Sequence, residues 1–311
     1  MIALVTVEKT VKQTTFNFGK SLGTAQAILA KQRRRLWQFV CLLLFEPTSC
    51  LLCQVETRAE ANQQDSRQDH LPLCQAIDKP ALLARGAKLT RAARATLCME
   101  CMEFFCTLTE VKTTLIGDDD SPTMPCFASG FYSGPLQEAI YQIKYLKRPE
   151  LANALGFALL PPTVALLKSL TDVDTDKIVV VPVPLHKSKV KERGFNQAEE
   201  LARSVAHLLN AKVDSSSLKR VRATRPQFGL SRGERRRNLD GAFVAASGLA
   251  TKNVLLVDDV LTSGATIYEC AAAVSAAGGT VLGAITLARA KWQKRGQPEE
   301  STVVPAISIV I

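Results

Sequence analysis

The second half of the chain alternates short apolar runs with segments whose apolar residues recur at helical spacing. The runs "KIVVVPVPL", "NVLLVDDV" and "TVLGAITLAR" are rich in β-branched residues and largely continuous, which is typical of strands buried on both faces. We therefore predict strands at 177–185, 253–260 and 280–289, and helices at 196–210 and 266–279. This order predicts an α/β fold with a parallel sheet, in which ligands bind at the carboxyl ends of the strands.

The region before these elements is less regular. Residues 127–160 predict a strand or turn followed by two helices, and residues 162–176 join them to the sheet. The apolar run 36–45 follows the basic "KQRRR", as in a signal peptide, but it is short, and Glu46 and Pro47 occupy the place of a cleavage site. We favour a buried helix there. Because no apolar run approaches the ~20 residues that cross a bilayer, no transmembrane span is predicted.

The charge of the chain changes which partners are worth considering. With 311 residues, the chain is long enough for one large domain or two modest ones, and its net charge is +10. Such a charge favours phosphates, nucleic acid or an anionic surface, although solvated basic faces produce the same balance. Residues 1–35 are strongly basic, and a loose basic arm, a targeting segment and a misassigned start remain alternatives for them.

Cysteines suggest a metal site. "CLLC" and "CMEC" place Cys50 with Cys53 and Cys98 with Cys101, and a short knuckle of this kind turns both sulfurs toward one point. Four thiolates would leave a Zn²⁺ ion no open position, so the zinc would be structural. A redox pair and unrelated buried thiols are the alternatives, while disulfides are disfavoured without a secretion signal. The polar segment 57–70 predicts a flexible insert between the two pairs.

The second predicted strand of the sheet ends in two adjacent carboxylates, Asp258 and Asp259, followed by small hydroxyl residues. Such carboxylates can accept hydrogen bonds from ribose hydroxyls, directly or through Mg²⁺ and its waters. The loop then enters a helix, whose N-terminus favours a phosphate. Thr262 and Ser263 add hydroxyl donors, and Gly264 lets the backbone approach the phosphate closely. The unit predicts a site for a phosphorylated ribose, and a solvated turn followed by a helix cap is the alternative.

Two basic segments accompany this unit. Residues 186–197, "HKSKVKERGFNQ", follow the first predicted strand and bring Arg193, a side chain suited to bidentate phosphate contact, near the same sheet edge. Residues 219–243 hold many arginines and few acids, a composition that suits a nucleic-acid backbone as well as a phosphate-binding lid. Phe228 is the only aromatic residue among these arginines, too few for a base-stacking platform. A solvated basic face is the alternative for both segments.

Taken together, these motifs resemble the type I phosphoribosyltransferase family and, within it, the ComF/GntX-type competence proteins. The matching stretches are "LLLFEPTSCLLC", "CMEC", "YSGPLQEAIYQIKY", "VVPVPLHKSKVKERGFNQAEELA", "RVRATRPQFGLSRGERRRNLDGAF" and "VLLVDDVLTSGAT". The resemblance implies a type I phosphoribosyltransferase-like parallel sheet with flanking helices, preceded by a small zinc-binding module. It implies a cysteine-rich module at 36–126 and a phosphoribosyltransferase-like domain at 127–290, between the poorly ordered arm 1–35 and the tail 291–311.

The resemblance also implies which residues bind phosphoribosyl pyrophosphate (PRPP) with Mg²⁺. The predicted PRPP loop consists of Asp258, Asp259, Val260, Leu261, Thr262, Ser263, Gly264, Ala265 and Thr266. The predicted pyrophosphate contacts are Lys191, Arg193 and Gly194, and the predicted lid residues are Arg225, Gln227, Arg235 and Arg236.

If the protein is an enzyme, the resemblance implies a phosphoribosyltransferase, that is, a pentosyltransferase, that displaces pyrophosphate at the anomeric carbon of the ribose. Asp258 and Asp259 would position the ribose and stabilise developing positive charge, and Arg193 would stabilise the leaving group. The acceptor is not indicated. Two positions depart from the family pattern: Ile77 stands where a further cysteine is often found, and Ser263 replaces a threonine while keeping a hydroxyl.

Resemblance to ComF proteins implies a role in DNA uptake during transformation. It implies a cytoplasmic location, peripheral to the inner face of the membrane, with single-stranded DNA and helicase-like or competence proteins as partners. GntX-type relatives imply substrate utilisation instead. The alternative to an enzyme is a non-catalytic protein of the same fold that binds single-stranded DNA or protein partners of the uptake machinery.

Overall fold

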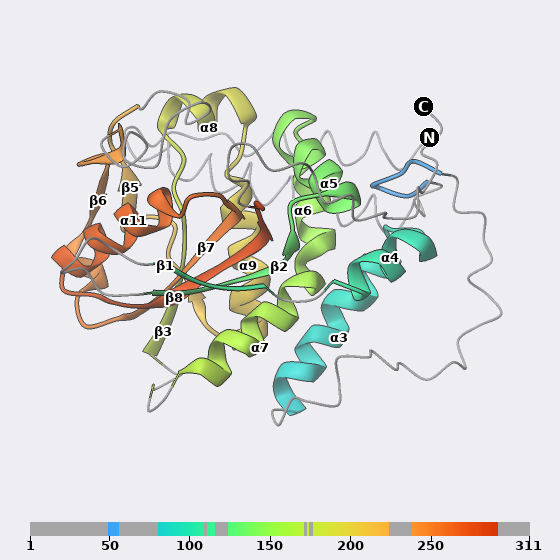
Figure 1. Ribbon diagram of the computed structural model, residues 1–311, viewed down its shortest axis with the longest axis horizontal. Coiled ribbons are helices and arrows are strands. Elements are labelled where there is room, and N and C mark those ends of the chain that lie inside the picture. The colour runs from blue at the N-terminus through green and yellow to red at the C-terminus, as the bar shows by residue number, and fades with distance from the viewer. Residues whose placement is uncertain are drawn as a thin grey trace, which may run out of the picture. The chain divides into compact units, whose positions relative to one another are not determined.

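The computed structural model describes residues 49–55, 80–108, 111–115, 124–170, 173, 177–223 and 238–291. All of them belong to one compact unit, Ser49–Ile311 (Figure 1). Several predictions fall outside the described residues: the arm 1–35, the apolar run 36–45, the insert 57–70, Ile77, the lid residues Arg225, Gln227, Arg235 and Arg236, and nearly all of the tail 291–311. The domain boundaries at 126 and 290 stay predictions.

The described helices and strands are distributed along the whole unit. The helices are α3 (Pro80–Arg94), α4 (Met99–Cys106), α5 (Gly134–Tyr145), α6 (Pro149–Ala154), η2 (Leu155–Leu159), α7 (Leu160–Ser169), α8 (Lys187–Arg193), α9 (Gln197–Leu209), η4 (Ser247–Leu249) and α11 (Ala265–Ala276). The strands are β1 (Val111–Leu115), β2 (Met124–Phe131), β3 (Ile178–Pro182), β4 (Lys212–Val213), β5 (Leu218–Arg220), β6 (Phe243–Ala245), β7 (Asn253–Leu261) and β8 (Thr280–Arg289).

A six-stranded sheet with the order β1-β2-β8-β7-β3-β4 forms the centre of this unit. β1 is antiparallel to β2, and every other neighbouring pair in this sheet is parallel. The predicted α/β sheet with flanking helices is therefore confirmed, with β3, β7, β8, α9 and α11 at the predicted places. The segment predicted as a connection to the sheet is helical as far as Ser169, and α8 was not predicted.

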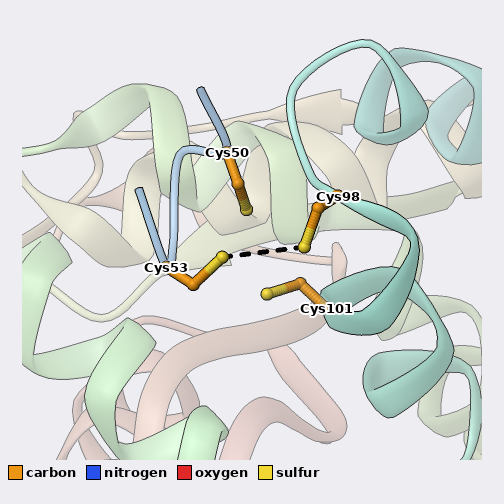
Figure 2. A group of neighbouring side chains, drawn as sticks. All are labelled: Cys50, Cys53, Cys98 and Cys101. Carbon is orange, nitrogen blue, oxygen red and sulfur yellow. Dashed lines mark hydrogen bonds between the residues drawn. The ribbon is translucent and has the colours of Figure 1, made fainter. Parts of the chain in front are cut away.

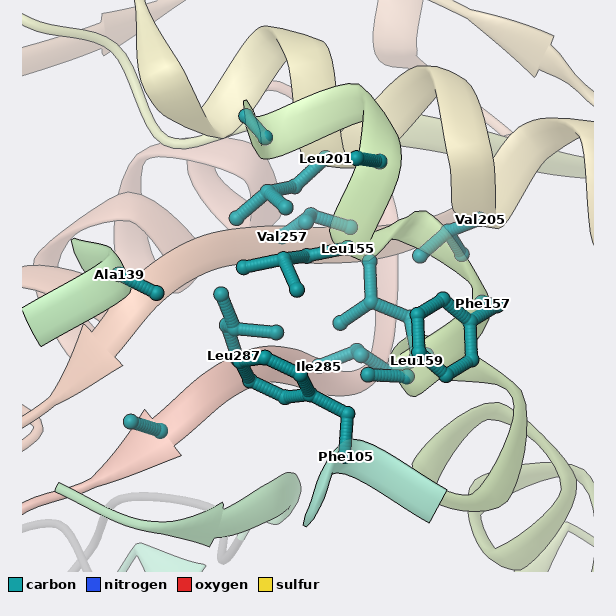
Figure 3. Close-up of a cluster of buried hydrophobic side chains, with 14 of the residues drawn as sticks. Phe105, Ala139, Leu155, Phe157, Leu159, Leu201, Val205, Val257, Ile285 and Leu287 are labelled. Carbon is teal, nitrogen blue, oxygen red and sulfur yellow. The ribbon is translucent and has the colours of Figure 1, made fainter. Parts of the chain in front are cut away.

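The sheet is buried on both faces, which explains its continuous apolar strands. Alternate residues of β7 enter two different hydrophobic clusters: Leu255 and Val257 belong to one, and Val254 and Leu256 to the other. Helices α5, α6, α7 and α9 cover the first face, while α11 and the β5–β6 pair cover the second (Figure 1). In Figure 3, Val257 lies among leucine side chains of the first cluster.

The cysteine-bearing elements share the first of these clusters. Phe105 of α4 contacts Phe157 of η2 edge-to-face, with ring centroids 6.4 Å apart (Figure 3). Cys50 and Leu52 are buried in the same cluster as the sheet residues. The cysteine region is therefore packed against the α/β layer, and a change in one is expected to affect the stability of the other.

One helical stretch among the described residues, Pro149–Ser169, is long and apolar enough to be considered for a membrane span. Of its most apolar window, 72% is buried inside the fold, as in the core helix of a soluble protein. It is therefore weak evidence for a span.

Candidate functional site

The carboxyl ends of four parallel strands meet at one edge of the sheet. Leu261 of β7 is in register with Arg289 of β8, which is in register with Phe131 of β2. On the other side of β7, Pro182 of β3 pairs with Val257. The last four residues of β7 thus extend beyond the pairing with β3, and they include the two predicted carboxylates at the edge where such sheets bind ligands.

Asp258 and Asp259 have different surroundings. Asp258 Oδ1 accepts a hydrogen bond from the backbone N–H of Asp259 at 2.8 Å. Burial, followed by the neighbouring Asp259 charge, raises the pKa of the Asp258 carboxyl to about 7. Asp259 is only 5% exposed, and its Oδ2 lies 2.8 Å from Nζ of Lys144 on α5. The structure therefore brings a lysine to the carboxylate pair.

Lys144 is a site residue that the sequence analysis missed. Burial lowers the pKa of Lys144. The charge of Asp259 and the hydrogen bond to Asp259 together raise this pKa by more than burial lowers it, so the net pKa lies above the ordinary value. The charges of Asp258 and Arg193 also act on Lys144, which places both residues close to it. The sequence gives little signal for this role, because a lysine in the last turn of a helix is an ordinary helix-stabilising residue.

The loop after the carboxylates has the predicted form. Thr262 is exposed, and Gly264 has a φ of 80°, a left-handed conformation that glycine adopts without strain. Helix α11 begins immediately afterwards, and Ser263 Oγ accepts a 3.5 Å hydrogen bond from the backbone of Ala265. Arg289 donates to the carbonyl oxygen of Thr262, a contact that fixes the loop to the end of β8 and that sequence analysis did not anticipate.

The basic segment after β3 forms α8, and hydrogen bonds join its C-terminal end to α9 and to the exit of β3. Gly194 has a φ of 88° and ends the helix, and Arg193 donates to Gln197 Oε1. Asn196 caps α9 by accepting from Ala198 and donates to the carbonyl oxygen of Val183 at 3.0 Å. These bonds tie Arg193 to the exit of β3. Lys191 is exposed on α8.

The two ends of the predicted lid segment meet at the β5–β6 pair. The backbone N–H of Val221 donates to the carbonyl oxygen of Ala242 at 2.8 Å, and Arg222 donates to backbone oxygens of Asn238 and Asp240. The segment between them lies outside the described residues, so the lid stays a prediction.

We expect the Lys144–Asp259 pair to contribute to stability. Replacing Lys144 with methionine leaves a buried carboxylate without its ion pair, which is expected to cost about 2 kcal/mol of unfolding free energy for this partly exposed lysine. Urea denaturation of wild type, Lys144→Met, Asp259→Asn and the double variant measures the coupling between the two residues. Strictly additive effects would show that the pair contributes nothing.

The stability of the fold should also depend on the Asp258 proton. Its pKa rises on folding from 3.8 to about 7, so the folded chain holds the proton more tightly than the unfolded chain. This stabilisation is present below about pH 4 and is lost as the pH rises to about 7. Between pH 4 and pH 8, wild type should lose about 1–3 kcal/mol more unfolding free energy than Asp258→Asn. Parallel pH profiles from denaturant titrations would contradict this expectation.

The four cysteines of the two knuckles converge on one point (Figure 2). Their sulfurs all lie within 4.8 Å of one another, and Sγ of Cys53 is 3.6 Å from Sγ of Cys98. A tetrahedral Zn²⁺ with ~2.3 Å bonds separates its sulfurs by about 3.8 Å, so the arrangement fits this ion. All cysteines in the described part of the chain are free thiols, and the quartet can hold a structural metal such as zinc.

The thiols are not independent acids. A hydrogen bond from Cys101, followed by weaker effects, lowers the pKa of Cys50 to about 4, whereas the pKa of Cys101 is strongly raised by the same interaction. Burial raises the pKa of Cys53 to about 11. Four crowded thiolates repel one another, and a divalent cation would remove that cost by neutralising them together.

Backbone and side-chain hydrogen bonds join the first knuckle to its surroundings. The backbone N–H of Leu51 donates to the carbonyl oxygen of Thr96, just before the second knuckle. Gln142 of α5 is buried and donates to the carbonyl oxygen of Leu52 at 3.0 Å, while Arg148 donates to the Gln142 side chain. Because Gln142 and Lys144 share α5, this helix connects the cysteine quartet to the carboxylate pair.

These features define a class: an α/β protein with a mostly parallel sheet, a carboxylate–lysine cluster at its carboxyl edge and a four-cysteine cluster that can hold a metal. The chain is 38% identical over 140 residues to the DNA utilization protein YhgH of Salmonella typhi, which covers 45% of this chain and 61% of that protein. It is 39% identical over 93 residues to Competence protein F of Haemophilus influenzae, covering 29% of this chain and 41% of that protein. It is 27% identical over 146 residues to Competence protein ComFC of Bacillus subtilis, covering 45% and 53%.

These relatives support a ComF-type competence family for the chain, as its motifs implied. No family model matches it. The chain spans about three fifths of the length of the DNA utilization proteins that it matches, 61% for the Salmonella typhi protein.

Proposed function

We propose that the carboxyl edge of β7 binds PRPP, or a related phosphorylated ribose, together with Mg²⁺. One observation carries the proposal: a buried central strand, β7, bears Asp258 and Asp259 near its carboxyl end, and a short loop through Gly264 leads directly into the N-terminus of α11. The carboxylates suit the ribose hydroxyls and a hydrated Mg²⁺, and the helix N-terminus suits the 5-phosphate. The parallel sheet is compatible with a type I phosphoribosyltransferase-like fold.

Neighbouring cations support the same ligand. Lys144 and Arg193 are held at the same edge of the sheet, Lys144 at Asp259 of β7 and Arg193 near the exit of the adjacent β3. Lys144 neutralises Asp259, and Arg193 is held at the exit of β3 by Gln197. Both cations can meet the negative charge of a pyrophosphate group. The catalytic step at this PRPP site would be pentosyl transfer.

The relatives suggest the process that this site serves. They are named for DNA utilization and competence, and we extend that role to this chain: a function in DNA uptake, with single-stranded DNA and other proteins of the uptake machinery as partners. The free thiols among the described residues suit a reducing compartment such as the cytoplasm. The quartet of Cys50, Cys53, Cys98 and Cys101 would hold zinc as a structural element.

Isothermal titration calorimetry tests the proposal. Purified protein loaded with zinc is titrated with PRPP in the presence of Mg²⁺, and then with PRPP after Mg²⁺ has been removed. We expect saturable binding that depends on Mg²⁺. The absence of binding by the intact, folded protein would overturn the PRPP proposal and favour the alternative, a non-catalytic binding protein of the same fold.

A further inference from the structure

An exposed aromatic pair lies on α5, away from the buried face of this helix. Tyr141 and Tyr145 are one helical turn apart, and their ring centroids are 5.0 Å apart with ring planes inclined by 38°. They are 48% and 64% exposed, and the adjoining Leu146 is 52% exposed. Large apolar side chains that gather on a surface are typical of interaction sites. We call Tyr141, Tyr145 and Leu146 the tyrosine surface.

The tyrosine surface lies near the carboxyl edge of the sheet. Tyr132 directly follows β2, and burial is the main reason that its pKa is raised. The charges of Lys144 and Asp259 and the hydroxyl of Tyr145 also act on this group. Lys144, the residue before Tyr145, pairs with Asp259 at 2.8 Å, so the exposed pair lies next to the carboxylate site.

Basic side chains border the tyrosine surface. Lys147 follows α5 and is exposed, and α8 has no buried residue. The ion pair of Lys144 with Asp259 brings the end of α5 to the carboxyl end of β7, and α8 follows the carboxyl end of the adjacent β3, so both helices lie at the same edge of the sheet (Figure 1). The exposed lysines of α8 are Lys187, Lys189 and Lys191.

We propose that a single-stranded nucleic acid binds here, with bases stacked on Tyr141 and Tyr145 and phosphates along Lys147 and the lysines of α8. Proteins that bind single strands without sequence preference combine a basic track with aromatic side chains on which bases stack. Few acidic side chains oppose this charge: Glu138 is the acidic residue of α5, and Glu192 on α8 is paired with Lys189 at 2.8 Å. A surface that was only basic would bind duplexes as well, whereas stacking requires unpaired bases.

This surface differs from the basic segment 219–243, for which the sequence offered too few aromatic residues. The tyrosines were not recognised as a platform from the sequence, because "YQIKY" is equally typical of a core helix with two aromatic residues. Only the exposed fractions of the two tyrosine side chains show that they form a surface for stacking rather than part of the hydrophobic core. The choice of DNA rather than RNA as the bound strand rests on the proposed function in DNA uptake. The nucleic-acid site does not depend on the proposal that the protein binds PRPP.

Fluorescence anisotropy of a labelled oligothymidylate of about 20 nucleotides, titrated with the full zinc-loaded chain, tests the proposal. Replacing Tyr141 and Tyr145 with alanine should weaken binding about tenfold or more for each stacked base lost. Tyr141→Phe with Tyr145→Phe should retain most of the affinity, because the rings remain. Val244, which is 53% exposed on β6, provides a matched control as Val244→Ala.

The outcomes separate this proposal from the PRPP proposal. Unchanged oligothymidylate binding by the double alanine variant, or equal binding of a duplex of the same length, would overturn it. A folded wild-type protein without affinity for the oligonucleotide would also overturn it and would assign the surface to a protein partner. Asp258→Ala with Asp259→Ala should leave the anisotropy titration unchanged, so a failed PRPP site does not affect this test.

Discussion

Replacing Asp258 and Asp259 together with alanine is expected to abolish measurable binding of PRPP and Mg²⁺. A hydrogen bond to a charged group contributes about 1.5–3 kcal/mol, so losing both carboxylates should weaken binding by at least about 100-fold. The effect should be larger for the magnesium complex than for PRPP alone, because carboxylates are the ligands that Mg²⁺ prefers in proteins. Calorimetric titration of wild type and variant in parallel measures the difference.

The control for this experiment must separate the loss of a ligand group from the loss of the fold. Asp240 is exposed beside the β5–β6 pair, so Asp240→Asn removes one carboxylate without touching the site. Because removing Asp259 leaves Lys144 without its ion pair, the fold of the double alanine variant is checked by urea denaturation beside wild type. If a folded double alanine variant still binds PRPP as tightly as wild type, the ligand lies elsewhere and the site is misassigned.

Much of the fold followed from local patterns. The run from Asn253 to Leu261 is apolar because both of its faces are buried, and its two carboxylates interrupt that run beyond the end of the neighbouring β3. The cysteine quartet was also predictable, because each knuckle is a local turn and only the meeting of the two knuckles requires the fold. In both cases the signal lies within a few residues of sequence.

The missed features depend on contacts between distant segments. Lys144 and Asp259 lie far apart in the sequence, on α5 and β7. Nothing in "YQIKY" specifies which face of α5 turns toward β7. Gln142 likewise has a polar side chain in a helix, and only the fold shows that it is buried against the carbonyl oxygen of Leu52. A helical periodicity predicts which residues share a face, but the partner of that face comes from tertiary packing.

Removing the metal from the cysteine quartet is expected to destabilise the whole unit. Structural zinc contributes on the order of 10 kcal/mol in small zinc domains, which is comparable with the total stability of an ordinary domain. Cys50 and Cys101 belong to the hydrophobic cluster that includes sheet residues, and Gln142 joins the first knuckle to α5. Chelation, or Cys101→Ser, should therefore lower the unfolding temperature of the α/β layer as well as disorder the knuckles.

Cys106 provides the matched control for that prediction, because it lies on the same helix, α4, as Cys101 but outside the quartet. Cys106→Ser should retain one zinc per chain by elemental analysis and should change the unfolding temperature little. Hydrogen exchange then locates the effect: after chelation, amides of α5 should lose protection together with those of the first knuckle, because Gln142 joins α5 to Leu52. Protection of α5 that is unchanged in the metal-free protein would confine the metal to a local role and would leave the carboxylate site independent of it.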